Sequence, residues 1–213
     1  MIAYLFDLDG VILDSMPVHI SAWRAYLAQH GIPAGDLPGR MHGRRNDEIV
    51  RAYWGDQLTP EENFAHGQAK EALFRQMMAP VFAQHLVPGV VSFLRSLQGQ
   101  PVGLGSNAER ANIDFTLRHA GLTDVFHHIV DGHQVEHPKP HPEIYWRLAE
   151  ALRVSPARCL VFEDSLAGVT AARRAGMRVV GVDTGRVNLA PVDLRIDHFL
   201  DPRLPAFLAS LDS

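Results

Sequence analysis

Two aspartates lie one residue apart directly after a short apolar run near the start of the chain. The run covers residues 2–6 and is typical of a buried strand, and Asp7-Leu8-Asp9-Gly10 follows it. Because side chains alternate along a strand, Asp7 and Asp9 are expected to point the same way. Two buried like charges repel, so the pair needs a cation or a shared proton. The alternative is an ordinary polar exit from a strand. A calcium loop is excluded, because it needs a glutamate at its twelfth position and His19 stands near there.

Three further polar groups lie at later connections of the chain. Ser106-Asn107 follows the second apolar run and offers a hydroxyl and backbone N–H groups that suit an anion. Lys139 lies in the Pro-rich loop 137–142, just before an expected helix, and Glu163-Asp164 ends another apolar run. In an α/β sheet such connections gather at the carboxyl ends of the strands. We therefore expect the acid pairs, the hydroxyl and the lysine to lie in one site.

The elements that must position these residues alternate along the chain. Apolar runs rich in β-branched and aromatic residues predict strands at 2–6, 101–105, 127–131, 159–163 and 178–182. Helical patterns cover 108–120 and 165–175, and Gly121 and Gly176 stand where a left-handed helix cap is expected. Strands and helices in this order predict an α/β fold with a parallel sheet.

One long stretch departs from this alternation. Between residues 15 and 84 no strand pattern is present, and a polar cap followed by Pro17 marks a helix start. Ile20, Trp23 and Leu27 follow at helical spacing, and a second helical pattern runs from Thr59 to about residue 82. We predict an α/β domain formed by residues 1–14 and 85–213, with an inserted α-helical domain at 15–84. The tryptophans of the insertion are expected to pack in its core.

Composition limits the kind of protein. Of 213 residues 46% are hydrophobic and 21% are charged, which supplies a core and excludes global disorder. The formal net charge of -4 makes nucleic acid an unsuitable main partner, and no apolar run is long enough to span a membrane. The single cysteine, Cys159, is expected to be a buried structural thiol. Without a basic leader or a disulfide framework, we expect a cytoplasmic protein, with a monomer as the default.

The motifs together resemble those of the haloacid dehalogenase superfamily in their order and spacing. The resemblance rests on four motifs and covers almost the whole chain: Asp7-Leu8-Asp9-Gly10-Val11, Ser106-Asn107, Lys139-Pro140 and Glu163-Asp164. The helical insertion after the first motif resembles the α-helical cap of the branch that contains β-phosphoglucomutase and phosphoglycolate phosphatase. The resemblance implies a Rossmann-like core with an inserted cap, and phosphoryl transfer as the reaction.

The resemblance also implies a role for each motif residue. Asp7 would attack phosphorus and become an aspartyl phosphate, while Asp9 would protonate the leaving oxygen and later accept a proton from water. Ser106, Asn107 and Lys139 would hold the phosphoryl oxygens. A carboxylate attacking an anion needs a hard cation such as Mg²⁺ between them. Its expected ligands are Asp7, the backbone carbonyl of Asp9 and Asp164, with Glu163 nearby.

Residues of the inserted domain are expected to set the substrate. His19 and Lys70 match positions that the mutase branch uses near the substrate, although a core histidine and a solvated helix lysine remain alternatives. Asn46 stands where sugar-phosphate mutases carry an arginine that grips a second phosphate, unless Arg44 or Arg45 replaces it. An amide cannot supply a bidentate charge. We therefore predict a phosphatase of a small, soluble phosphate monoester, such as a sugar phosphate.

Two other functions stay open. A hexose-phosphate mutase would use the same site and return the phosphoryl group to the substrate instead of water. A silent phosphate-binding or regulatory protein would have no need for Asp7 and Asp9 together. A third pattern, His133-x-x-Glu136-His137, matches a metalloprotease motif, but that motif needs a helix and Pro138 disfavours one.

Overall fold

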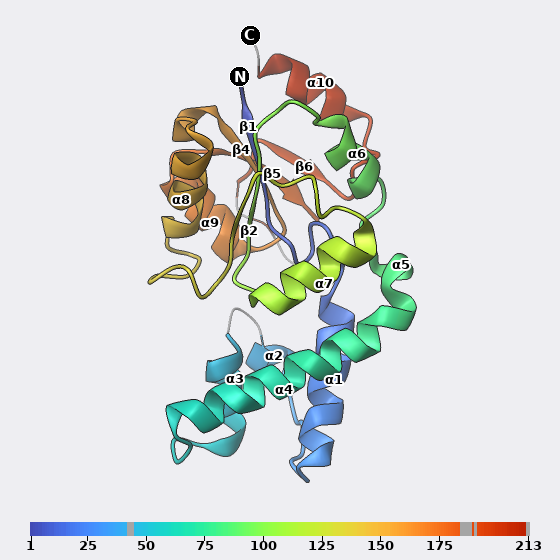
Figure 1. Cartoon of the computed structure of the whole chain (residues 1–213), viewed down its shortest axis with the longest axis vertical. Coiled ribbons are helices and arrows are strands. Elements are labelled where there is room, and N and C mark those ends of the chain that lie inside the picture. Colours follow the sequence, from blue (N-terminus) through green and yellow to red (C-terminus); the bar gives the residue numbers. More distant parts are fainter. Residues whose placement is uncertain (42–44, 184–188, 190, 212–213) are drawn as a thin grey trace. The chain divides into compact units, whose positions relative to one another are not determined.

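A computed structural model describes residues 1–41, 45–183, 189 and 191–211 (Figure 1). The chain divides into two compact units, one formed by Met1–Asp14 with Ala83–Ser213 and the other by Ser15–Phe82. The second boundary falls two residues before the one predicted at 84. Arg44, named above as a substitute for the missing arginine, lies outside the described residues. Among the described helices, none is both long and apolar enough to cross a membrane.

The first unit is built on one parallel sheet of six strands in the order β3-β2-β1-β4-β5-β6. The strands are β1 (Ala3–Phe6), β2 (Val102–Gly105), β3 (His128–Val130), β4 (Cys159–Glu163), β5 (Arg178–Val182) and β6 (Leu194–Ile196). The chain moves outward from β1 to one side through β2 and β3, then returns to β4 and moves to the other side. The switch point, where α/β folds place their sites, therefore lies between β1 and β4.

The predicted α/β fold with a parallel sheet is confirmed, with one strand more than predicted. The edge strand β6 is only three residues long and contains an exposed arginine between a half-buried leucine and a buried isoleucine. So short a run gives too little periodicity to be distinguished from a loop.

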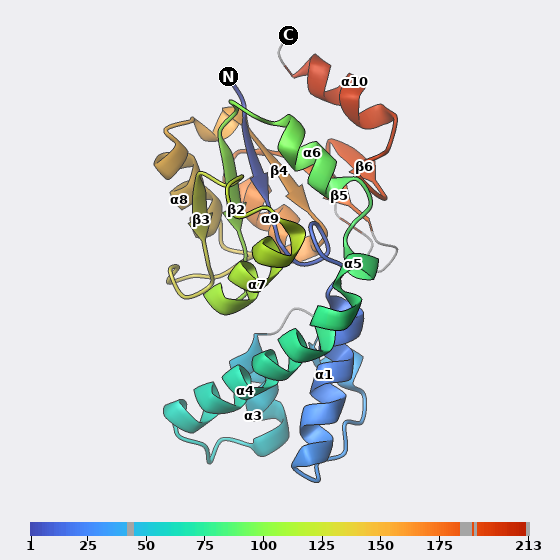
Figure 2. The same cartoon turned by 45° about the vertical axis from the view of Figure 1, so that its right-hand side comes forward.

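Helices cover both faces of the sheet (Figure 2). On one face Phe6 and Phe162 stack at 4.6 Å and pack with residues of α6 (Val90–Ser96), α7 (Arg110–Ala120) and α10 (Arg203–Ser210). On the other face Leu5 and Val161 pack with α8 (Glu143–Leu152) and α9 (Leu166–Arg174). Neighbouring residues of one strand thus serve opposite layers, as the pleat requires. Cys159 is buried in β4, as predicted.

The second unit is helical, with its own core. It contains α1 (Met16–Gln29), α2 (Leu37–Met41), α3 (Asn46–Trp54) and α4 (Pro60–Met78). The start of α4 is fixed by a capping box, in which Thr59 and Glu62 exchange hydrogen bonds of 3.2 and 2.8 Å. Trp23 and Leu27 are fully buried in this core, and Trp54 packs against it half-buried. The short remaining elements are η1 (Ala79–Val81), α5 (Phe82–His85) and, in the sheet unit, η2 (Pro156–Arg158).

Candidate active site

Three carboxylates meet at the carboxyl ends of β1 and β4. Phe6 and Phe162 are paired in register, so Asp7 and Glu163 leave the two strands side by side. One oxygen from each of Asp7, Glu163 and Asp164 lies within 4.8 Å of the others. The side chains of Asp7 and Glu163 are buried, and Asp164 is half-buried. The carboxyl-edge site predicted from the apolar runs is therefore formed by neighbouring strands at the switch point.

Lys139 enters this group from the loop before α8. Its Nζ donates to Asp7 Oδ1 at 2.8 Å, to the carbonyl of Gly105 at 2.9 Å and to Glu163 Oε1 at 2.5 Å. Burial lowers the pKa of Lys139, but the charges of Asp7 and Glu163 outweigh that effect and hold the pKa above its ordinary value. The ammonium is therefore a permanent positive charge in contact with the ends of β1, β2 and β4.

Glu163 is held from all sides. Its Oε1 accepts from Lys139 and from the hydroxyl of Tyr145 at 2.7 Å, and its Oε2 accepts from the Ser165 hydroxyl at 3.1 Å. The backbone N–H groups of the next two residues also donate to Oε2. A side chain at Gly168 would collide with Oε1, since a Cβ there would stand 1.8 Å away. Glu163 is therefore fixed in the orientation in which it accepts from Lys139.

The cluster carries more negative than positive charge. Burial, together with the charges of Glu163 and Asp9, raises the pKa of Asp7 to about 7 against the lowering effect of Lys139. Burial and the charges of Glu163 and Asp7 hold the pKa of Asp164 well above its usual range. Three carboxylates around one ammonium leave an oxygen-rich group whose charge a hard divalent cation would balance. The donor set therefore fits Mg²⁺.

Asp9 lies close to this cluster, and its charge acts on both Asp7 and Asp164. Because β1 ends at Phe6, both aspartates lie in the following turn and not in the strand. Strand alternation therefore does not explain how they point. The turn is instead held by the Gly10 N–H, which donates to the carbonyl of Leu13 at 2.8 Å. Asp9 is half-buried, unlike Asp7.

Ser106 and Asn107 form the turn after β2 and are tied to the lysine loop. The buried Ser106 accepts a hydrogen bond from the Ala108 N–H at 3.1 Å, and Asn107 Oδ1 accepts from the Lys139 N–H at 3.4 Å. A Cβ at Gly132 would stand 2.4 Å from the Asn107 carbonyl, so the loop after β3 also closes against this turn. The structure thus brings together every site residue predicted in the sheet unit.

The predicted residues of the helical unit form a second polar group. Lys70 is 1% exposed, forms an ion pair with Glu71, and its Nζ lies 3.2 Å from His19 Nδ1. Asn46 Nδ2 donates to Glu71 Oε1 at 2.6 Å. His19 in turn stacks on Phe74, with ring centroids 3.7 Å apart. Lys70 is therefore not a solvated helix lysine.

Glu71 is the residue that sequence reasoning missed. Burial raises its pKa, but Lys70, His19 and Asn46 together lower it to about 2. One signal was available, since a lysine on the buried stripe of α4 requires a partner of opposite charge. Nothing in the helical periodicity identified which acid it was.

Comparisons with known proteins agree with this architecture. Residues 2–176 match the family of haloacid dehalogenase-like hydrolases. The chain is 32% identical to a β-phosphoglucomutase of Bacillus subtilis, covering 87% of this chain and 85% of that protein. It is also 32% identical to the fructose-1-phosphate phosphatase YqaB of Escherichia coli, over 84% of this chain and 94% of that one. The crystal structure of β-phosphoglucomutase from Clostridium difficile superposes with a TM-score of 0.84 at 28% identity, covering 100% of this chain and 98% of that one.

Fold and site together define an α/β enzyme whose strand ends gather carboxylates, a lysine and a serine. The chain belongs to the haloacid dehalogenase-like hydrolase family. The predicted family, fold and class of enzyme are thereby confirmed. The roles assigned to the individual site residues stay predictions.

Proposed function

We propose that this protein is a Mg²⁺-dependent phosphatase that hydrolyses a small phosphate monoester, such as a sugar phosphate, through an aspartyl phosphate on Asp7. The observation that carries the proposal is the buried contact of Lys139 with both Asp7 and Glu163. It leaves a carboxylate and a fixed positive charge side by side at the switch point. Phosphatases and a phosphomutase among the relatives support the same class of substrate.

Asp7 acts as the nucleophile in this proposal. One of its carboxylate oxygens forms a bond to phosphorus as the bond to the leaving oxygen breaks, which gives an acyl phosphate. Water then attacks the same phosphorus and releases inorganic phosphate and the free carboxylate. Asp9, half-buried beside Asp7, donates the proton that the leaving oxygen needs and takes one from the attacking water.

Positive charge and hydrogen-bond donors stabilise the negative charge on the phosphoryl oxygens. The Lys139 ammonium already contacts the nucleophile, and the Ser106 hydroxyl and Asn107 N–H belong to the turn tied to the lysine loop. Asp7, Asp164 and the backbone carbonyl of Asp9 would hold Mg²⁺, with Glu163 nearby. The bound cation supplies the charge that lets a carboxylate approach a phosphate dianion.

The helical unit is proposed to be the cap that selects the substrate. His19, Asn46 and Lys70 are its proposed substrate contacts, with Glu71 holding the last two in place. The carboxamide of Asn46 is neutral and one of its N–H groups donates to Glu71, so it cannot bind a second phosphate with the charged, bidentate contact of an arginine. This favours water over a sugar as the phosphoryl acceptor. Hexose-phosphate mutase remains the alternative, because β-phosphoglucomutases are among the similar proteins.

Phosphate release from a panel of monophosphates tests the proposal. The panel contains β-glucose 1-phosphate, glucose 6-phosphate, fructose 1-phosphate and phosphoglycolate, each assayed with Mg²⁺, with EDTA and with the variant Asp7→Asn. We expect release that requires both Mg²⁺ and Asp7. Conversion of β-glucose 1-phosphate to glucose 6-phosphate, without net release and only with a bisphosphate primer, would establish the mutase instead. Substrate binding without either reaction would indicate a silent binding protein.

A further inference from the structure

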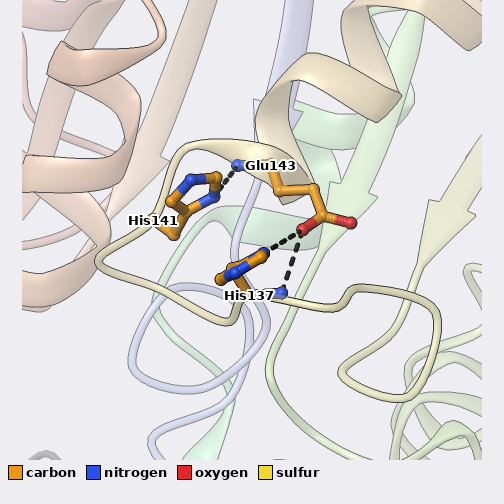
Figure 3. Close-up of side chains that lie close together, drawn as sticks. All are labelled: His137, His141 and Glu143. Atoms are coloured by element: carbon orange, nitrogen blue, oxygen red, sulfur yellow. Dashed lines mark hydrogen bonds and ion pairs between the residues drawn. The ribbon is translucent and has the colours of Figure 1, made fainter.

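A second group of metal-ligating side chains lies at the start of α8, apart from the carboxylate cluster. His137 and His141 come from the Pro-rich loop, and Glu143 is the first residue of the helix (Figure 3). One ring nitrogen from each histidine and one oxygen of Glu143 lie within 4.8 Å of one another. In the close-up the rings of His137 and His141 both lie next to the Glu143 side chain. Neither histidine has a part in the proposed phosphatase reaction.

The spacing of these atoms suits a tetrahedral metal ion. The Nδ1 of His137 lies 3.4 Å from Glu143 Oε2. Two ligands that each stand about 2.1 Å from a tetrahedral Zn²⁺ are themselves about 3.4 Å apart. The two imidazole rings have centroids 4.7 Å apart. The three ligand atoms lie within 4.8 Å of one another, so the His141 ring has to approach the other two ligands before a tetrahedral ion can contact all three.

Glu143 is fixed and ionised before any metal arrives. Its Oε2 accepts from the backbone N–H of His137 at 2.9 Å, and its Oε1 accepts from the N–H of Glu136 at 3.1 Å and from Arg147 Nε at 2.9 Å. These backbone hydrogen bonds, with Arg147, lower the pKa of Glu143 to about 2. The Arg147 guanidinium contacts Oε1, whereas Oε2 is the oxygen that lies near the His137 ring.

His137 is accessible to an ion from solvent, and the ring of His141 is oriented by its neighbours. The His137 side chain is 58% exposed, so an ion and the water that completes its coordination can reach the site. His141 is half-buried, accepts from the Glu143 N–H at 3.3 Å and meets the Trp146 ring edge-on at 5.9 Å. These contacts hold the ring beside Glu143 when no ion is bound, and coordination through Nδ1 would replace the hydrogen bond from the Glu143 N–H.

We propose that His137, His141 and Glu143 bind one Zn²⁺ ion, at a site separate from the Mg²⁺ cluster. Two imidazoles and one carboxylate are the ligand set of zinc sites that retain a water. Mg²⁺ prefers oxygen ligands alone, and the group formed by Asp7, Glu163 and Asp164 offers only oxygens. The two sites are thus distinguished by the chemistry of their ligands. The zinc site differs from the His133-x-x-Glu136-His137 pattern and shares only His137 with it.

Zinc binding to the whole protein in saturating Mg²⁺ tests this site. Titration with Zn²⁺ against a chromophoric chelator gives affinity and stoichiometry, and Co²⁺ in place of Zn²⁺ reports tetrahedral geometry through its visible absorption. We expect one ion per chain, with binding weakened roughly tenfold or more in His137→Ala and in His141→Ala. His133→Ala is the matched control, because its side chain is 55% exposed and lies four residues from His137. It is expected to bind as the wild type does.

Two comparisons make the result decisive. Asp7→Asn is expected to leave Zn²⁺ affinity unchanged, because Asp7 belongs to the other cluster. The thermal unfolding of each histidine variant without Zn²⁺ is compared with the wild type, which separates lost ligands from lost structure. The proposal is overturned if no ion binds in the presence of Mg²⁺, if His133→Ala weakens binding as much as His137→Ala, or if Asp7→Asn abolishes it.

Discussion

The carboxylate of Asp164 lies where the side chain of any other residue at position 10 would have to be. A Cβ at Gly10 would stand 1.9 Å from Asp164 Oδ2, and Gly10 has a φ of +75°. The turn after β1 and the acid after β4 therefore fit together only because residue 10 lacks a side chain. This contact joins the two aspartate motifs across the switch point.

Gly10→Ala is expected to displace Asp164 and to lower both Mg²⁺ affinity and turnover by at least about tenfold. The change adds a collision to the cost of a positive φ, which is roughly 1–2 kcal/mol for a residue with a Cβ. Gly99→Ala is the matched control, because Gly99 has a φ of +81° and nothing within 4 Å of its would-be Cβ. Both variants should lose stability, but only Gly10→Ala should lose metal binding. Equal Mg²⁺ affinities of Gly10→Ala and Gly99→Ala would contradict a role for the close fit of Gly10 against Asp164 in metal binding.

Lys139→Met is expected to destabilise the protein by about 3–5 kcal/mol, because it leaves the buried carboxylates of Asp7 and Glu163 without the positive charge that pairs with them. Denaturant unfolding measures the loss. The exposed pair of Arg110 and Asp114 serves as the comparison, and Arg110→Ala should cost less than about 1 kcal/mol. Similar losses in the two variants would show that Lys139 does not bear the charge balance of the cluster.

Glu71 is expected to make the protein sensitive to acid. Its pKa in the folded state is about 2, below the ordinary value of 4.5, so its stabilising effect is complete above pH 4.5 and is lost as the pH falls toward 2. The shift corresponds to at most roughly 3 kcal/mol. The free energy of unfolding of Glu71→Gln should therefore be lower than that of the wild type at pH 6, and the two should converge near pH 2. A constant difference across this range would contradict the ionised pair with Lys70.

Without a metal, Asp7 is expected to make the folded protein less stable as the pH rises, which is the opposite of the effect of Glu71. Its folded pKa is about 7, above the ordinary value of 3.8, so the folded protein in EDTA should lose stability as the pH rises from about 4 to 7. Mg²⁺ should remove most of this dependence, since a cation favours the charged carboxylate. Thermal unfolding with and without Mg²⁺ measures the difference, and Asp7→Asn should show a smaller slope, because the raised pKa of Asp164 still contributes to it. A wild-type slope that Mg²⁺ leaves unchanged would place the metal elsewhere.

Strand ends were the most predictable part of the site. Asp7 and Glu163 follow apolar runs whose character alone places them at the carboxyl edge of a buried sheet. Lys139 comes from a Pro-rich loop without periodicity, so its position at a connection before a helix placed it at the same sheet edge, but its direct contact with Asp7 was not predicted. Periodicity also could not show that Glu71 on α4 is buried, because a charged residue on a long helix normally faces solvent.

Loop geometry was the least predictable part. The region 133–137 is not helical, which agrees with the expectation drawn from Pro138. The same loop nevertheless turns back so that His137 meets Glu143, six residues later. No local spacing rule describes that turn, because it depends on backbone hydrogen bonds to the glutamate.

Trapping a phosphorylated protein tests the role of Asp7 most directly. Asp9→Ala, which is expected to slow the second step, is incubated with acetyl [³²P]phosphate and Mg²⁺, quenched in acid and digested. We expect label on the peptide that contains Asp7, sensitive to hydroxylamine as acyl phosphates are, and no label when Asp7→Asn is added to the same variant. Phosphate release by the wild type, with label absent from that peptide or bound to another residue, would contradict Asp7 as the nucleophile.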